Sequence, residues 1–328
     1  MNAGTRKRRL WLAGLAAVVA VLAVAAGLAA LWFATIPETV PASALPRYTP
    51  DLDNGETMFA IGGCASCHAV PNADKSKIDR TRLGGGLALK TPFGTFYAPN
   101  ISPDRNDGIG RWSEANFITA MWKGTDPQDQ NLYPAFPYTS YQHMQLDDVR
   151  DLFAYLKTLP PVKGRPPDHQ LSFPFNIRRL IGVWKLLFLH GEPFAPDPAK
   201  SAQWNRGAYL VEGPGHCAEC HSPRNLLGGI VARERFAGGP AVDGDGFVPN
   251  ITPAGLKHWS KQDLAWSEKN IATFLDDGMN PAGDYAGGAM AEVIRGTSQL
   301  DAADRGAIAA YLAALPPVEG PKPPPEKK

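Results

Sequence analysis

The sequence lacks several features that mark common classes of protein. It has no long run of one charge: 33 Lys and Arg residues stand against 32 Asp and Glu residues among 328 positions, for a formal net charge of +1. A nucleic-acid-binding chain would concentrate basic residues on one face, so the composition argues against that partner. The sequence also has no glycine-rich dinucleotide fingerprint, so it offers no candidate site for the primary oxidation of a substrate.

Convincing alternation of apolar and polar residues, the pattern of a half-buried strand, is missing from both halves of the sequence. Turn-forming residues are plentiful instead, with 33 Gly and 31 Pro. Short helical patterns separated by such turns predict a mostly α, loop-rich fold. Because 44% of the residues are hydrophobic, the chain can still bury two ordinary cores.

One stretch lacks charge altogether. The run from Leu10 to Phe33 is uncharged and follows the basic residues 6–9. As a helix it would span about 36 Å, enough to cross a bilayer. The basic cluster favours the cytoplasmic side, which places the rest of the chain in the periplasm. We therefore expect a basic stub and a single-pass inner-membrane anchor over residues 1–35. A cleaved signal peptide is the alternative, although its apolar region is usually only about 7–15 residues.

An internal repeat is the strongest organisational signal. Residues 64–68 recur as residues 217–221, and three further segments recur at a similar offset: 98–103 with 248–253, 112–117 with 266–271, and 154–162 with 310–318. We predict two tandem domains, over residues 50–163 (the first module) and 201–319 (the second module). Ser113 and Ser267 are expected to cap a helix in each. The remaining segments are a linker (36–49), a connector (164–200) and a disordered Pro/Lys-rich tail (320–328).

The connector contains the sequence FPFNIRRLIGVWKLLFLHGEPF, which is too apolar for a flexible linker. It is either a packed interdomain segment or a contact surface for a partner subunit or the membrane interface.

All four cysteines of the chain fall in two Cys-x-x-Cys-His segments, CASCH and CAECH. This pattern is the attachment signature of c-type haem: the two thiols form thioethers with the haem vinyl groups, and the histidine reaches the iron. Disulfides and structural zinc are the alternatives for an exported chain. A disulfide does not require the histidine, and zinc would need further ligands near each pair. We therefore predict two covalently bound haem c groups, with attachment and proximal ligation by Cys64, Cys67, His68, Cys217, Cys220 and His221.

A haem that only transfers electrons usually has a second axial ligand, commonly a methionine, which raises the potential. In the second module we expect Met290, with Met279 as the alternative. In the first module we expect Met144, although a core role would also explain it. His143, then Met121, or an open haem are the alternatives there.

Five segments of the sequence resemble class I-like c-type cytochromes: GCASCHAV, TPFGTFYAPNISPDRNDGIGRWS, LYPAFPYTSYQHM, WNRGAYLVEGPGHCAECHSPRN and GGAMAEVI. More closely, they resemble the membrane-associated multihaem cytochrome subunits of periplasmic alcohol, aldehyde and gluconate dehydrogenases. The resemblance covers about residues 50–319. Many subunits of that group resemble a three-haem arrangement, whereas this sequence has two attachment segments.

This resemblance implies two tandem class I-like cytochrome c domains, with Met290 in the position of a ligand loop. It also implies an electron relay from a periplasmic dehydrogenase, or another redox protein, to quinone or a further respiratory cytochrome. A peroxidase-type dihaem enzyme with one open haem is the alternative function. It would need acid and base groups near bound peroxide, and none stands out in the sequence.

Several residues near the attachment segments are expected to surround the haems. Asn100 and Asn250 would hydrogen-bond either a haem propionate or a loop carbonyl, or serve only as turn residues. Arg224 would pair with a propionate or remain a solvated surface charge, and His216 would lie beside the haem without binding iron. Core packing around the porphyrin is expected of four aromatic residues: Tyr97, Trp112, Trp259 and Trp266.

Overall fold

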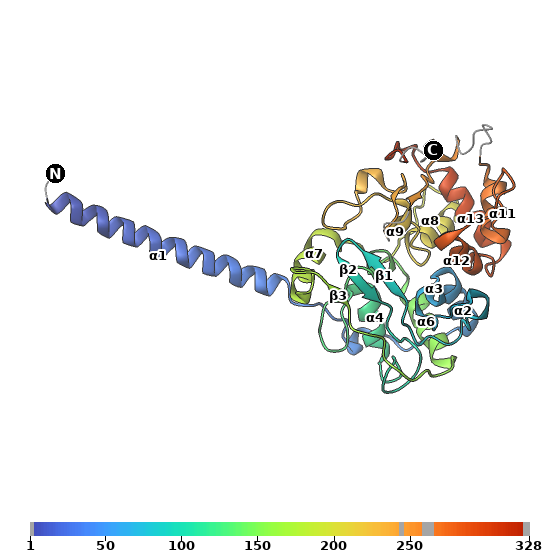
Figure 1. The fold of residues 1–328 in the computed structure, drawn as a ribbon, viewed down its shortest axis with the longest axis horizontal. Helices are drawn as coiled ribbons and strands as arrows, with labels where there is room; N and C mark the ends of the chain where they lie inside the picture. The colour runs from blue at the N-terminus through green and yellow to red at the C-terminus, as the bar shows by residue number, and fades with distance from the viewer. Residues whose placement is uncertain (1–2, 243–245, 258–265, 324–328) are drawn as a thin grey trace.

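The structure is a computed structural model that describes residues 3–242, 246–257 and 266–323. Helix α1 (Ala3–Ala34) projects from a two-lobed body of short helices and loops (Figure 1). Its segment Arg9–Ala34 is long and apolar enough to cross a membrane, and none of the tested span is buried by the rest of the chain. Trp259 and residues 324–328 of the predicted tail lie outside the described residues.

The first module is built from short helices. They are α2 (Leu52–Ile61), α3 (Cys64–His68), α4 (Glu114–Lys123), α5 (Tyr138–Tyr141) and α6 (Leu146–Thr158). Helix α4 begins at the predicted cap, because the Ser113 hydroxyl accepts a hydrogen bond from the Asn116 amide (3.1 Å). Helix α2 crosses α6 closely: a Cβ on Gly55 would lie 2.3 Å from the Asp151 carbonyl oxygen, so only glycine fits there.

The second module repeats this arrangement. Its helices are α8 (Ala202–Glu212), α9 (Ala218–His221), α10 (Pro253–Leu256), α11 (Glu268–Asp277), α12 (Gly288–Thr297) and α13 (Ala302–Ala313). Ser267 caps α11 as predicted, accepting from the Asn270 amide at 3.1 Å. Gly207 on α8 packs on the carbonyl of Ala307 on α13, as Gly55 packs on α6. The duplication therefore includes the helix crossing as well as the motifs.

Short strands complete the fold, in contrast to the prediction from the sequence. β1 (Ala88–Thr91) and β2 (Gly94–Tyr97) form a hairpin, to which β3 (Gln170–Leu171) adds a third strand. β4 (Gly239–Pro240) pairs with β5 (Phe247–Val248). Strands of two to four residues are too short to show a reliable alternation, which explains why the sequence pattern missed them.

Some loops contain short 3₁₀ segments. They are η1 (Ala42–Ala44), η2 (Lys75–Lys77) and η4 (Ala232–Glu234). The connector contributes β3, the 3₁₀ turn η3 (Arg178–Leu180) and α7 (Ile181–Phe188). It therefore has regular secondary structure, while the choice between a packed segment and a contact surface stays open. The boundaries of the six predicted segments stay predictions.

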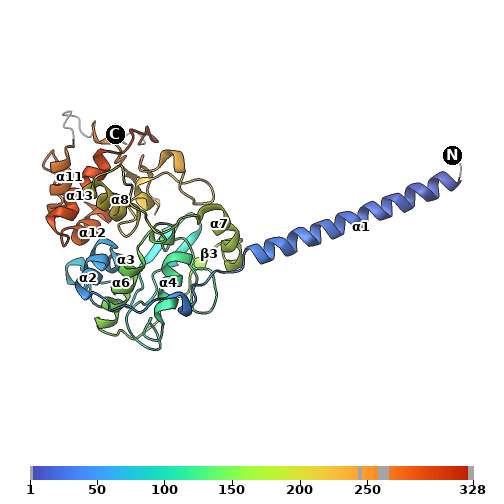
Figure 2. The same ribbon diagram turned by 180° about the vertical axis from the view of Figure 1, so that it is seen from behind.

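The two modules pack directly on each other, with one connected set of buried residues running through both. Helix α12 of the second module lies against α2 of the first, and both views show them adjacent (Figures 1 and 2). Gly296 permits this contact, because a Cβ there would lie 2.2 Å from the Ala60 carbonyl oxygen. The predicted attachment segments stand close to this interface.

Candidate functional site

Each Cys-x-x-Cys-His segment forms a single helical turn after a residue in the left-handed region. Gly63 (φ 57°) precedes α3, and His216 (φ 39°) precedes Cys217, the N-cap of α9. Neither pair of cysteines forms a disulfide in this structure. Burial raises the pKa of the Cys64 and Cys217 thiols to about 12, which disfavours the thiolate that zinc binding or disulfide exchange requires.

A zinc site would also need ligands from elsewhere in the chain. Over residues 3–242, 246–257 and 266–323, no group of three or more His, Cys, Asp or Glu side chains could hold a metal ion. The donor chemistry at each segment, two cysteines followed by one histidine, instead fits a covalently attached haem.

The two predicted proximal histidines are held in the same way. His68 Nδ1 hydrogen-bonds the Pro99 carbonyl oxygen at 2.8 Å, and His221 Nδ1 hydrogen-bonds the Pro249 carbonyl oxygen at 2.8 Å. A carbonyl only accepts, so Nδ1 carries the proton and Nε2 keeps its lone pair for a metal. Desolvation by the surrounding protein lowers the pKa of both imidazoles, which favours the neutral ligand form.

Asparagine side chains fix the loops that supply these carbonyls. Asn100 Nδ2 donates to the carbonyl oxygens of Val162 (2.7 Å) and Gly164 (2.9 Å). Its Oδ1 accepts from both the amide (2.9 Å) and the hydroxyl (2.7 Å) of Ser102. The loop-carbonyl prediction therefore holds for Asn100, and the propionate alternative is wrong, because all of its polar atoms are already engaged.

The second module has the same set of asparagine hydrogen bonds. We call this set, together with the proline carbonyl that holds the histidine, the carbonyl clasp. Asn250 Nδ2 donates to the Val318 carbonyl oxygen at 2.7 Å, and its Oδ1 accepts from the amide and the hydroxyl of Thr252, both at 2.8 Å. The sequence repeat contained Pro99 and Pro249, yet the role of their carbonyls was not inferred. Their recurrence directly before Asn100 and Asn250 was the available signal.

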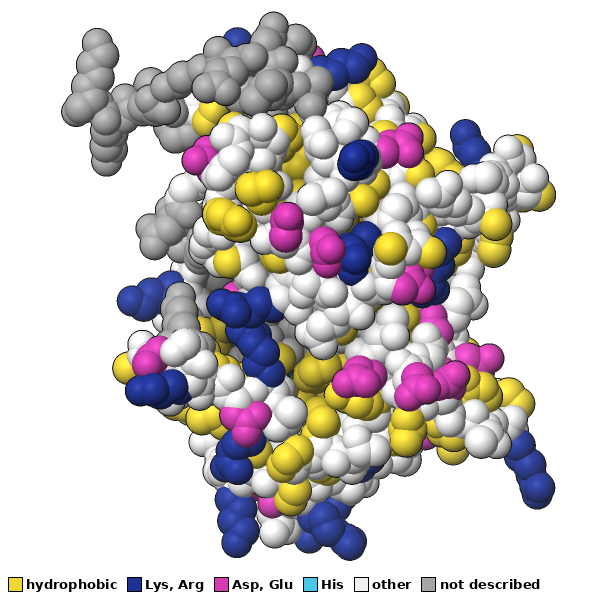
Figure 3. All heavy atoms as spheres, turned by 90° about the vertical axis from the view of Figure 1, so that its right-hand side faces the viewer, with side chains coloured by type: hydrophobic (Ala, Val, Ile, Leu, Met, Phe, Trp, Pro, Cys, Tyr) yellow, Lys and Arg dark blue, Asp and Glu magenta, His cyan; other side chains and the backbone are white. Residues whose placement is uncertain are grey.

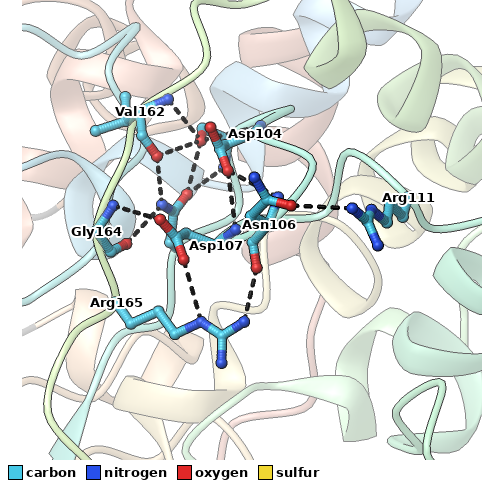
Figure 4. A network of polar contacts seen from close by, with 9 residues as sticks. Asp104, Asn106, Asp107, Arg111, Val162, Gly164 and Arg165 are labelled. Carbon is cyan, nitrogen blue, oxygen red and sulfur yellow. Dashed lines mark hydrogen bonds and ion pairs between the residues drawn. The ribbon is translucent and has the colours of Figure 1, made fainter.

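The clasp in the first module is tied to the start of the connector (Figure 4). Asp107 Oδ2 accepts from the Gly164 amide at 2.9 Å, and Arg165 donates to the Asn106 carbonyl oxygen at 2.7 Å. A cavity of about 420 Å³ lies beside this network, lined in part by Tyr97 and Arg165. Tyr97 therefore borders the cavity and is not fully enclosed in the core.

The predicted distal methionines occupy different settings. Met144 is 1% exposed between α5 and α6, and its carbonyl oxygen accepts from Trp122 Nε1 at 3.2 Å. Met290 is partly buried within α12, so the ligand loop expected there is helical in this structure. Met279, the alternative, is 40% exposed. Both iron-ligand assignments stay predictions.

The alternatives to Met144 also have defined places. Met121 is a buried core residue on α4. His143 Nδ1 hydrogen-bonds the Glu192 carbonyl oxygen at 2.8 Å, which ties that ring to the connector.

Trp112 and Trp266 are partly buried and pack against the core. This placement agrees with their predicted packing role.

The two attachment segments meet at the module interface. The Gly62 carbonyl oxygen, two residues before Cys64, hydrogen-bonds His216 Nε2 at 3.2 Å and accepts from the Tyr141 hydroxyl at 3.3 Å. The rings of Tyr141 and His216 stack edge to face, with centroids 5.7 Å apart. His216 is thus engaged across the interface, and the sequence did not reveal Tyr141 as its partner.

Arg224 forms an ion pair within the protein. Its guanidinium pairs with Glu219 Oε2 at 2.6 Å, inside the interface, so the solvated-charge alternative is wrong, and pairing with a propionate stays a prediction. Glu219 Oε1 also accepts from the hydroxyls of Thr139 (2.6 Å) and Ser140 (3.0 Å) of the first module. Burial raises the pKa of Glu219, but Arg224 and these hydrogen bonds lower it to a net value below its ordinary range.

Comparison with known proteins supports the same chemistry. A family model described as cytochrome c matches residues 52–160. A diheme cytochrome c-type protein of Cereibacter sphaeroides is 46% identical over 312 residues, covering 95% of this chain and 100% of that protein. The fructose dehydrogenase cytochrome subunit of Gluconobacter japonicus is 37% identical over 285 residues, covering 85% of this chain and 55% of that subunit.

A cytochrome c subunit of alcohol dehydrogenase (quinone) from Gluconacetobacter polyoxogenes is 35% identical over 278 residues, covering 82% of this chain and 58% of that subunit. The chain thus spans the whole of the first relative and little more than half of the two dehydrogenase subunits. The paired cysteines, an available imidazole Nε2 and the full-length match lead to one conclusion. The chain belongs to the c-type cytochromes and has two covalently bound haem c groups.

Proposed function

We propose that this cytochrome is a membrane-anchored electron relay that accepts electrons from a periplasmic dehydrogenase. It would pass them to quinone or to another respiratory cytochrome. The haems supply the one-electron redox chemistry when bound, and the chain contributes ligands, burial and orientation. Two relatives are named as cytochrome subunits of dehydrogenases, one of them with quinone in its name, which supports this class of donor and acceptor.

The residue roles follow from the predicted pattern and from the duplicated geometry. Four cysteines attach the haems, and His68 and His221 are the proximal ligands. The carbonyl clasp holds each imidazole neutral and oriented. Met144 and Met290 are the proposed distal ligands, whose thioether sulfurs would favour the ferrous state.

Contact between the residues that precede the two attachment segments is the observation that carries the proposal. Because the Gly62 carbonyl is bonded by His216 from the other module, the residues leading to both first cysteines lie within hydrogen-bond reach of each other. Electrons could therefore pass between the two haems inside one chain. A partner is needed only at the entrance and the exit of that path.

The anchor completes the proposal. Helix α1 ends at Ala34, directly beside the body of the molecule, and η1 is the only helical element between it and α2 (Figure 1). If α1 spans the inner membrane, the haem modules stand at its periplasmic surface. A quinone in that membrane would then lie close to the haem modules.

Haem stoichiometry is the first test. The full chain, matured in a host with haem-attachment machinery and stripped of non-covalent haem, should give two haems per chain in an alkaline pyridine spectrum. The double variants Cys64→Ala/Cys67→Ala and Cys217→Ala/Cys220→Ala should each retain one. A chain without covalent haem would contradict the site assignment.

Co-purification tests the relay itself. The tagged chain, extracted from its native membranes, should bring a dehydrogenase whose substrate reduces both haems. A chain that purifies alone, and whose haems respond neither to a co-extracted dehydrogenase nor to quinol, would contradict the relay.

A further inference from the structure

Exposed apolar side chains gather on two short segments next to α1. Among the described residues outside α1, fifteen large hydrophobic side chains are exposed. Eight of these belong to residues 173–187 and 226–227, although the two segments make up a small part of the chain. We call this group the apolar collar: Phe173, Phe175, Ile177, Leu180, Leu186, Leu187, Leu226 and Leu227.

Helix α7 within the collar has an unusual composition for its position. Apart from Lys185, its sequence IGVWKLLF is apolar, yet Gly182 is its only buried residue. A helix that is hydrophobic all round is normally enclosed by protein or lies in lipid. The described part of the chain does not enclose α7, so another apolar phase should cover it.

The collar is held firmly against both modules. Lys185 Nζ donates to the Gly124 carbonyl oxygen and to Asn131 Oδ1 of the first module, both at 2.7 Å. Trp184 Nε1 donates to the Leu227 carbonyl oxygen of the second module at 2.9 Å. These bonds fix α7 and the loop at residues 226–227 as one continuous surface, which excludes a loose linker.

The collar adjoins the end of α1 (Figures 1 and 2). The Arg179 guanidinium lies 4.4 Å above the centroid of the Trp32 ring and donates to the Trp32 carbonyl oxygen at 2.5 Å. Gly182 packs on Thr35, which follows the last residue of α1. The surface that α7 exposes therefore begins where the apolar run of α1 ends.

The length of the apolar part of α1 indicates which of its residues would lie at the membrane surface. The 26 residues from Arg9 to Ala34 would extend about 39 Å, against a hydrocarbon core of about 30 Å. The last turn, with Trp32, then lies at the interface, where tryptophan is enriched. With α1 at this level, the Arg179 guanidinium over the Trp32 ring would face the lipid phosphates.

We propose that the apolar collar is a membrane-interface surface that inserts into the leaflet from which α1 emerges. The inference rests on α1 being an anchor, as in the proposed function. Continuity with α1 favours lipid over a protein partner as the occupant. The face turned to the right in Figure 1 is different, since charged side chains of both signs are spread among its hydrophobic ones (Figure 3).

Spin labels on the full haem-bound chain can test this surface. The native cysteines are occupied by haem, so an introduced cysteine is the only free thiol. Leu187→Cys and Leu226→Cys report on the collar, which should lie within about 5–10 Å of the headgroup boundary. Leu52→Cys on α2, where the native side chain is 47% exposed, is the matched aqueous control. Leu22→Cys reports on α1.

The readout is collision with oxygen and with a water-soluble nickel chelate, in vesicles of phosphatidylethanolamine and phosphatidylglycerol. We expect both collar labels to collide with nickel severalfold less than the Leu52 label. The substitutions Leu186→Glu and Leu187→Glu together should move the Leu226 label toward water without changing the haem spectrum.

Two outcomes would overturn the inference, and they can be told apart. If the collar labels collide with nickel as often as the Leu52 label while the Leu22 label is in lipid, the collar is not in the membrane but α1 is. A protein partner would then be the occupant of the collar. If the Leu22 label is also aqueous, the anchor fails, and the collar proposal fails with it.

Discussion

Replacing Asn100 with alanine should loosen the clasp behind His68. Asn100 is 5% exposed and makes four hydrogen bonds, two to the carbonyls of Val162 and Gly164 and two to Ser102. At about 0.5–1.5 kcal/mol net for each, their loss sums to about 2–6 kcal/mol. The Ser102 hydroxyl still accepts from the Val162 amide at 3.0 Å. We therefore expect the lower half of that range in a guanidinium unfolding curve of the haem-bound chain.

The same substitution should also change one reduction potential. The Pro99 carbonyl makes the His68 ring a stronger donor to iron, because it accepts the Nδ1 proton. A looser carbonyl weakens this effect, which disfavours ferric iron and raises the potential. If the differential loss is about 0.5–1 kcal/mol, the rise is about 20–40 mV in a spectroelectrochemical titration.

Three results would refute this reasoning. The potential could fall, both haems could shift equally, or stability could remain unchanged. Asn250→Ala is the mirror variant and should shift only the other haem. Asn72→Ala, which removes one exposed turn hydrogen bond, to the Asp74 amide at 3.0 Å, is the control and should shift neither.

The other predictions concern the distal ligands and the interface. Met290→Ala should lower the potential of the second haem and remove its methionine-to-ferric-iron absorption, and an unchanged spectrum would exclude Met290. Met144→Ala should do the same at the first haem; if its spectrum is intact, His143 or an open site becomes the better assignment. Glu219→Ala removes the ion-pair partner of the partly buried Arg224. It should lower the free energy of unfolding in denaturant by about 3–5 kcal/mol. Because the folded pKa of Glu219 is lowered, wild-type stability should fall as the pH drops below about 4.3, and Glu219→Gln should lack that component.

Local chemistry explains what could be predicted from the sequence. The attachment segments, the Ser113 and Ser267 caps and the repeat are all written in neighbouring residues. Asp301 caps the last helix by the same local chemistry, accepting from the Asp304 amide at 2.6 Å. Such features need no knowledge of the tertiary fold, so periodicity and capping rules suffice for them.

Long-range partners explain what could not be predicted. Glu219 meets Thr139 across 80 residues of sequence, and His216 meets Gly62 across 154. Arg224 looked like a free cation because its partner Glu219 is buried only when the two modules pack. The resemblance placed Met290 in a ligand loop, yet it lies within α12, which begins at Gly288.

The proximal sides of the two modules are alike, whereas their proposed distal sides differ. The His–Pro–Asn geometry is nearly identical in both, with Nδ1 to carbonyl distances of 2.8 Å in each. The proposed distal ligands are not equivalent, since Met144 lies in a fully buried turn and Met290 in a partly buried helix. Burial and solvent access tune the potential at a fixed ligand type. The duplicated chain should therefore show two separate potentials, and a relay with a direction needs that difference.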